Sequence, residues 1–178
     1  MNNQGKTNKN IPIEDLIEDL GENTFHERHQ ARLQLVERGK ESIPALLDGL
    51  GSSNRHVRWG AVQALRELQE PSTAPDLVEM LKDDDPGIRW TARDSLIQMG
   101  RDSLLPLLRK YIDDYGSVLI REGAQHIIQA LNEDKVLEEI ASPELEQLAE
   151  ENLVDSASAS QQLRKVRDAL DWLEERFN

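Results

Sequence analysis

The strongest constraint on the fold is a segment that recurs about every 31 residues along the 178-residue chain. The four copies are Glu27–Leu35, Val57–Leu65, Ile88–Leu96 and Ile120–Ile128. A fixed period of this length is typical of proteins built from stacked supersecondary units, each of which buries its apolar face only against its neighbours. The sequence therefore predicts an array of repeats rather than a closed globular core.

Both halves of the repeat have the apolar spacing of a helix. In the second copy, Val57, Ala61 and Leu65 fall on one helical stripe. A second apolar segment lies between the copies and begins at a proline, which the first turn of a helix tolerates because that N–H has no partner within the helix. These prolines are Pro44, Pro75 and Pro106. The pattern predicts an all-α fold, a right-handed α-α superhelical solenoid of about four helical hairpins with a helical C-terminal cap.

The repeat resembles the HEAT-repeat family, in particular its short-repeat branch named after phycobilisome lyases (PBS lyase HEAT-like). The resemblance rests on Pro-x-Leu-Leu at 44–47, the acidic turn at 83–85 and Val-Arg-x-x-Ala-x-x-Ala-Leu at 57–65, and it covers about residues 11–132. It implies that the helix bearing the arginine lines a concave inner surface. It also implies that this arginine pairs with an Asp of the preceding turn, so that Asp83 or Asp84 serves Arg89.

Three segments are predicted along the chain. Residues 1–10 form a disordered N-terminal tail, residues 11–132 the repeat solenoid and residues 133–178 an acidic helical C-terminal cap with 13 acidic and 5 basic side chains. The last segment ends in an amphipathic stripe with alternating spacings of three and four. Its members are Leu163, Val166, Leu170, Leu173 and Phe177. We interpret this helix as a cap over the exposed end of the core, as stacked repeats require; a detachable helix that binds a partner or a second copy is the alternative.

Composition excludes several classes of function. The net charge of −13 argues against nucleic acid or an anionic membrane as the partner, because affinity for phosphate depends largely on Lys and Arg. Cysteine is absent, and no apolar run is long enough for a membrane span or a signal peptide. The four histidines lack metal-ligand spacing, and no nucleophile motif or phosphate loop occurs. We expect a soluble, cytoplasmic, non-enzymatic protein with no cofactor, no catalytic residue and no metal site.

A helical wheel supplies the candidate site. With Val57 at the centre of the buried stripe, Trp59 lies on the opposite face, and Trp90 occupies the same position one repeat later. Trp and Arg are the residues most enriched in interface hot spots, so we predict that this face binds a partner. The alternative is that each Trp stiffens the array by packing over the next repeat. The predicted partner-binding residues are His29, Arg32, Trp59, Arg66, Trp90, Arg93, Ile97, Glu122 and His126.

The favoured function is an adaptor or scaffold that binds a partner protein or peptide of acidic and apolar character on the concave face. The resemblance implies a second possibility, a bilin lyase-like subunit that handles chromophores on phycobiliproteins, because a groove with Trp and Arg could hold a ring system with propionate arms. A third is a structural module that self-associates through its C-terminal helix. The repeat pattern alone does not transfer an activity.

Overall fold

The computed structural model describes residues 11–154 and 159–177, and the chain forms two compact units, Met1–Leu68 and Gln69–Asn178. Every regular element among these residues is helical, so the predicted all-α class is confirmed. None of the described helices has the length and apolar character needed to cross a membrane. The tail predicted at residues 1–10 lies outside the described residues.

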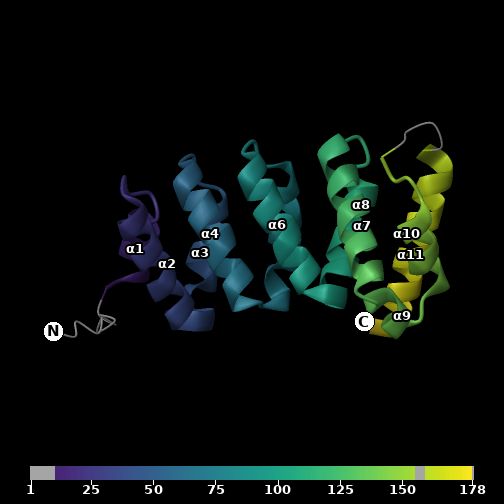
Figure 1. Cartoon of the computed structure of the whole chain (residues 1–178), viewed down its shortest axis with the longest axis horizontal. Helices are drawn as coiled ribbons and strands as arrows, with labels where there is room; N and C mark the ends of the chain where they lie inside the picture. The colour runs from purple at the N-terminus through teal and green to yellow at the C-terminus, as the bar shows by residue number, and fades with distance from the viewer. Residues whose placement is uncertain (1–10, 155–158, 178) are drawn as a thin grey trace. The chain divides into compact units, whose positions relative to one another are not determined.

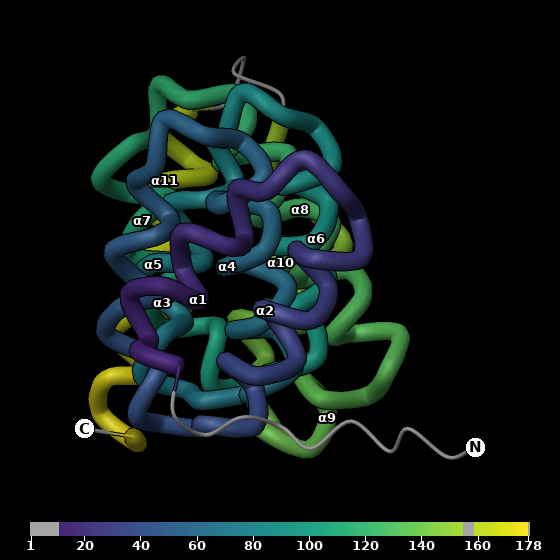
Figure 2. The backbone as a smooth tube through the Cα atoms, turned by 90° about the vertical axis from the view of Figure 1, so that its left-hand side faces the viewer, coloured from purple at the N-terminus to yellow at the C-terminus, as the bar shows by residue number. Residues whose placement is uncertain are grey.

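The first unit contains two helical hairpins. Its helices are α1 (Ile13–Asp19), α2 (Phe25–Arg38), α3 (Ile43–Leu50) and α4 (Arg55–Leu68), with a 3₁₀ turn η1 (Gly39–Ser42) before α3. In the end-on view α1 and α3 form one layer and α2 and α4 the other, and α2 packs on α4 while α1 packs on α3 (Figure 2). Fully buried Leu16, Leu35, Leu46 and Leu65 meet between the layers.

The second unit contains two further hairpins and the C-terminal helices. The hairpin helices are α5 (Ala74–Glu79), α6 (Pro86–Gln98), α7 (Leu104–Asp113) and α8 (Val118–Glu133), with 3₁₀ turns η2 (Pro71–Thr73), η3 (Met80–Lys82) and η4 (Gly100–Ser103). The C-terminal helices are α9 (Val136–Ile140), α10 (Pro143–Glu150) and α11 (Ala159–Phe177). Here α11 packs on α7 and α10 packs on α8, so each layer continues into the C-terminal helices (Figure 1).

Helix ends recur with the repeat. The first helical residues of α2 and α6 follow side-chain caps, where Thr24 accepts from the Glu27 N–H and Asp85 accepts from the Gly87 N–H. A positive φ follows the second helix in three repeats, directly after it at Gly39 and Gln69 and one residue later at Gly100, and this left-handed turn ends the helix. The first repeat therefore keeps the design even though Glu27 replaces the apolar residue found there in other copies.

The α11 helix is fastened to the second unit by buried apolar and polar contacts. Its face bearing Val166, Ala169 and Leu173 is buried against α7 and α10. The turn that follows α10 is held from two sides, because the Tyr111 hydroxyl donates to the Leu153 carbonyl at 3.0 Å and the Leu153 N–H donates to the Gln125 side chain at 2.5 Å. The apolar face of α11 is thus covered within the second unit, as the cap interpretation expects; whether the helix also detaches stays a prediction.

Candidate functional site

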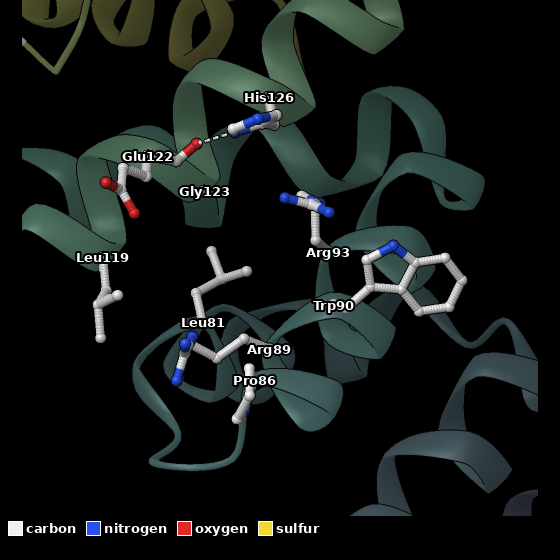
Figure 3. A pocket seen from close by; sticks show the side chains of 9 residues that line it. All are labelled: Leu81, Pro86, Arg89, Trp90, Arg93, Leu119, Glu122, Gly123 and His126. Atoms are coloured by element: carbon white, nitrogen blue, oxygen red, sulfur yellow. Dashed lines mark hydrogen bonds between the residues drawn. The ribbon is translucent and has the colours of Figure 1, made fainter.

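A hollow of about 240 Å³ lies in the second unit between α6 and α8, and we name it the Trp90 pocket. It is lined by Leu81, Pro86, Arg89, Trp90, Arg93, Leu119, Glu122, Gly123 and His126. Figure 3 shows Trp90 and Arg93 on the wall formed by α6, and Glu122 and His126 on the facing wall formed by α8. More than half of the lining residues are apolar or glycine, so the pocket offers contact area as well as charge.

The α6 helix displays its Trp and Arg because its opposite face is fully used by the core. Ile88, Ala92 and Leu96 are completely buried at four-residue intervals, which turns the intervening positions outward. Trp90 is consequently 56% exposed, the largest aromatic surface at this pocket. An indole with half of its surface in water and no ring partner among the described residues is available to cover a ligand.

Arg93 carries a charge for which the described residues supply no ion-pair partner. Its guanidinium forms no ion pair or hydrogen bond with any side chain or carbonyl in the described part of the chain. The acidic residue of the same pocket, Glu122, extends its carboxylate away from Arg93 (Figure 3). The hydrogen bond of His126 goes to a different group, because its Nδ1–H donates to the Glu122 carbonyl at 2.7 Å. The pocket thus places an uncompensated cation beside an exposed indole.

Glycine makes the pocket possible by bringing two helices close together. A Cβ added at Gly123 would lie 3.0 Å from Leu81 Cδ1, so η3, which lies between the two helices of the preceding hairpin, packs directly on the α8 backbone. Any side chain at this position would also project toward the hollow that the glycine borders. The interruption of the fourth copy by Gly123 is therefore a packing requirement of the pocket wall.

The first unit holds a hollow of about 170 Å³ between α2 and α4, which we name the Trp59 pocket. Its lining residues are Phe25, Arg28, His29, Arg32, His56, Trp59, Gly60 and Gln63. Phe25 stacks on the His29 ring with centroids 5.7 Å apart, and Trp59 is half-buried on the facing wall. Gly60 has the role of Gly123, since a Cβ there would lie 2.8 Å from Leu20 Cδ2.

Arg32, unlike Arg93, has side-chain partners among the described residues of its own unit. It forms an ion pair with Glu67, and its Nη2–H donates to His29 Nδ1 at 2.9 Å, which leaves the proton of a neutral His29 on Nε2. Burial lowers the pKa of Arg32 from its ordinary value. Burial, with the nearby charges of Arg28 and Arg55, also lowers the pKa of His56 on the other wall.

The recurring arginine of the repeat fastens the turn that precedes its own helix. Arg89 donates to the Asp83 and Asp84 carbonyls at 2.7 and 3.2 Å. The bond to the residue six positions earlier recurs in every copy, from Arg28 to Glu22, from Arg58 to Ser52 and from Arg121 to Tyr115. The predicted partners of Arg89, Asp83 and Asp84, are confirmed, and the accepting atoms are their backbone carbonyls, which the end of the first helix leaves unpaired.

A comparison with protein-family models matches HEAT repeats over residues 13–97 and, overlapping these, 43–129. Together these matches cover well over half of the chain. The chain belongs to the HEAT-repeat family. Sequence comparison with curated proteins finds no match.

Solved structures support the same fold. One that matches is the complex of CpcE and CpcF of phycocyanin lyase from Nostoc sp. PCC7120, with 20% identity and a TM-score of 0.55. The alignment covers 87% of this chain and 97% of that chain. At this level of identity the likeness concerns the fold of the HEAT repeats.

The HEAT repeats bring most of the predicted site residues into the two pockets. His29, Arg32 and Trp59 line the Trp59 pocket. Trp90, Arg93, Glu122 and His126 line the Trp90 pocket, whereas Arg66 and Ile97 line neither of them. Within residues 11–154 and 159–177, no three His, Asp or Glu side chains gather in a way that could hold a metal ion.

Sequence reasoning missed two kinds of pocket residue. The first kind is the recurring arginine, because Arg28 and Arg89 line the pockets while they fasten their turns. The second is the pair of glycines, Gly60 and Gly123, which the predicted site did not include. The two glycines occupy the same position of the second helix in copies two repeats apart, and this recurrence was a signal that could have revealed equivalent pockets in the two units.

Proposed function

We propose that this protein is a non-enzymatic adaptor that binds a partner protein or peptide on the repeat face bearing the Trp90 pocket. The observation that carries the proposal is the pairing of a 56% exposed indole with an arginine that has no partner in the described chain. Trp and Arg are enriched among the few residues that carry most of the binding energy in protein interfaces, where the surrounding contacts exclude water. An Arg left without a counterion is stabilised when a ligand brings one.

The family supports this proposal in a general way. HEAT repeats form extended surfaces lined by successive second helices, and such surfaces are commonly used to bind other proteins. The structural relative described above was solved as a complex of two chains. Both facts favour a protein partner over a small substrate, and neither identifies the partner.

The test is capture of partners from native cell extract by the wild-type protein and by Trp59→Ala/Trp90→Ala. We expect the double variant to lose capture while its helix content, measured by circular dichroism, stays near wild type. Leu33→Ala is a matched control, because Leu33 is an exposed apolar residue of α2 that lines neither pocket. Retained capture by the folded double variant would exclude the tryptophan face as the binding surface.

A second candidate function is the handling of a bilin chromophore on a phycobiliprotein. It is favoured by the structural similarity to the phycocyanin lyase complex and by a pocket that combines an indole with two arginines, Arg89 and Arg93. Titration with a bilin at micromolar concentration should then quench tryptophan fluorescence, and Trp90→Phe should reduce the quenching. Unchanged fluorescence in the wild type would exclude this function, while the adaptor function would be unaffected.

A further inference from the structure

The Trp59 and Trp90 pockets are formed by equivalent positions of the repeat. Every lining residue of the Trp59 pocket has a counterpart in the Trp90 pocket, at the equivalent helix position two repeats further along the chain. The counterparts are Phe25 and Pro86, Arg28 and Arg89, His29 and Trp90, Arg32 and Arg93, His56 and Leu119, Trp59 and Glu122, Gly60 and Gly123, and Gln63 and His126. Each pocket can therefore be used to interpret the other.

The equivalence explains why Arg93 has no partner among the described residues. In the first unit Arg32 forms its ion pair with Glu67, which lies on α4 two helical turns after Gly60. When α4 and α8 are aligned on their equivalent glycines, the residue of α8 that corresponds to Glu67 is Ala130. The helices α6 and α8 pack on each other as α2 and α4 do, so the second unit keeps the arginine and lacks the carboxylate that would neutralise it.

We propose that the Trp90 pocket binds an acidic side chain of a partner protein, flanked by an aliphatic or aromatic residue that covers Trp90. This inference rests on the proposed adaptor function and names the chemistry of its ligand. The ligand's carboxylate takes the place at Arg93 that Glu67 takes at Arg32. The first unit thus contains a built-in example of the contact that the second unit leaves open.

The charges around the pocket support an acidic ligand although the chain as a whole is acidic. Arg89 and Arg93 stand against the single carboxylate of Glu122, which points away from Arg93 (Figure 3). Repulsion from the other acidic groups of the chain is screened beyond about 10 Å at 0.1 M salt. A carboxylate in direct contact with Arg93 gains a charge-assisted hydrogen bond, which screening weakens much less.

The decisive variant gives Arg93 a carboxylate partner within the protein and leaves every lining residue of the pocket in place. Ala130→Glu supplies the missing carboxylate, which we expect to pair with Arg93 and to compete with the ligand. Ala130→Gln is the matched control, because it has the same size and no charge. Position 130 is partly exposed on α8, and both replacements are good helix formers, so circular dichroism should show that both variants fold.

The probe is the blocked peptide acetyl-Gly-Leu-Glu-Phe-Gly-amide, and its counterpart with Gln in place of Glu is the peptide control. Binding is followed by the shift of the Trp90 indole N–H signal in ¹H–¹⁵N spectra, assigned with Trp90→Phe. We expect the Glu peptide to shift this signal. Ala130→Glu should lower the affinity for the Glu peptide by about tenfold or more, as expected for the loss of a hydrogen bond to a charged group. Ala130→Gln should bind the peptide like the wild type.

The reciprocal variant is Glu67→Ala, which frees Arg32 in the first unit. We expect the Glu peptide then to shift the Trp59 indole signal as well, which it leaves unchanged in the wild type. A Trp90 signal that the Glu peptide does not move at millimolar concentration, or that both peptides move equally, overturns the carboxylate ligand.

The same variants distinguish failure of this inference from failure of the adaptor function. If Ala130→Glu captures partners from extract as well as the wild type does, while the tryptophan double variant does not, the adaptor function holds and the carboxylate ligand is wrong. If the double variant captures partners normally, the adaptor function itself fails.

Discussion

The Trp59 and Trp90 pockets share backbone positions and differ in chemistry. In the Trp59 pocket the indole is on α4, the second helix of its hairpin, and the arginine on the facing helix α2, Arg32, is paired within the protein. In the Trp90 pocket the indole is on α6, the same helix as the equivalent arginine, Arg93, which is unpaired among the described residues. Trp90 is largely exposed, whereas Trp59 is half-buried. The two hollows are therefore not two copies of one ready binding site.

The difference between the pockets shows which positions set their shape and which set their charge. Both hollows depend on a glycine of α4 or α8, Gly60 or Gly123, that lets a leucine of the preceding hairpin approach the helix backbone. Whether the arginine of each pocket is neutralised depends on position 67 or 130, which lies two turns further along the same helix and does not line the pocket. A repeat protein can thus keep one backbone design and change its ligand through a residue that does not line the pocket.

The largest effect is expected from filling the space that the glycines leave. Gly60→Val and Gly123→Val should each lower the free energy of unfolding by about 2 kcal/mol, because the added side chain meets Leu20 or Leu81 in a packed interface. Urea unfolding followed by circular dichroism measures the change. Gly116→Ala is the control, since a Cβ there meets no atom within 4 Å. Variants as stable as the wild type would show that the glycines are not required for close packing.

A smaller effect is expected from an ion-pair network found in the second unit, where Lys82 and Lys110 alternate with Glu79 and Asp114 at 2.5–3.6 Å. The hydrogen bond from Lys82 lowers the pKa of Asp114 below its ordinary value of 3.8. Burial alone would raise the pKa of Glu79, yet the hydrogen bonds from Lys110 and Lys82 lower it below 4.5. Groups with lowered pKa values in the folded state stabilise it above their ordinary values and lose this contribution as the pH falls through the folded values.

Lys82→Met should therefore destabilise the protein at pH 7, and the difference from the wild type should shrink as the pH falls below about 4. Urea unfolding at pH 7 and pH 3 measures both differences. Lys135→Met serves as the control, because the Lys135 side chain is 76% exposed and outside the network. A difference between Lys82→Met and the wild type that does not change with pH would contradict the role of the two carboxyl groups.

The smallest effect is expected from removing each arginine in turn. Arg32→Ala should lower the free energy of unfolding by about 0.5 kcal/mol, as is typical of a partly exposed ion pair, and the loss should diminish at high salt. Arg93→Ala has no such partner to lose within the described chain and should leave stability unchanged. Thermal unfolding at low and high salt compares the two variants. Equal losses of stability would show that Arg93 has a structural role.

Most of the architecture could be predicted from the sequence, because each repeat carries its own local signals. The prolines at 44, 75 and 106 and the apolar stripe beginning at Val57 predicted paired helices, and the structure has them as α3 with α4 and α5 with α6. The outward position of Trp90 was also predictable, because helical geometry places it opposite Ile88 and Ala92.

The details of the site could not be predicted in the same way. Arg66 and Ile97 share the outward face with Trp90, yet they line neither pocket, because a wheel gives direction and not the depth of the neighbouring surface. The Asp partners of Arg89 were predicted, but the sequence could not show that their backbone carbonyls are the accepting atoms. The contacts of Tyr111 and Gln125 with Leu153 could not be predicted either, because they join residues 42 and 28 positions apart.

By itself the sequence determined that the chain forms helical repeats and which side of each second helix faces away from the core, because both follow from spacing within a few helical turns. Only the tertiary structure decided that Arg32 is neutralised by Glu67 and that Arg93, unpaired in the described chain, stands beside an exposed Trp90. Pairing of charges between helices depends on how two repeats pack. That packing is fixed by contacts such as those of Gly60 and Gly123, whose meaning appears only when the neighbouring hairpin is in place.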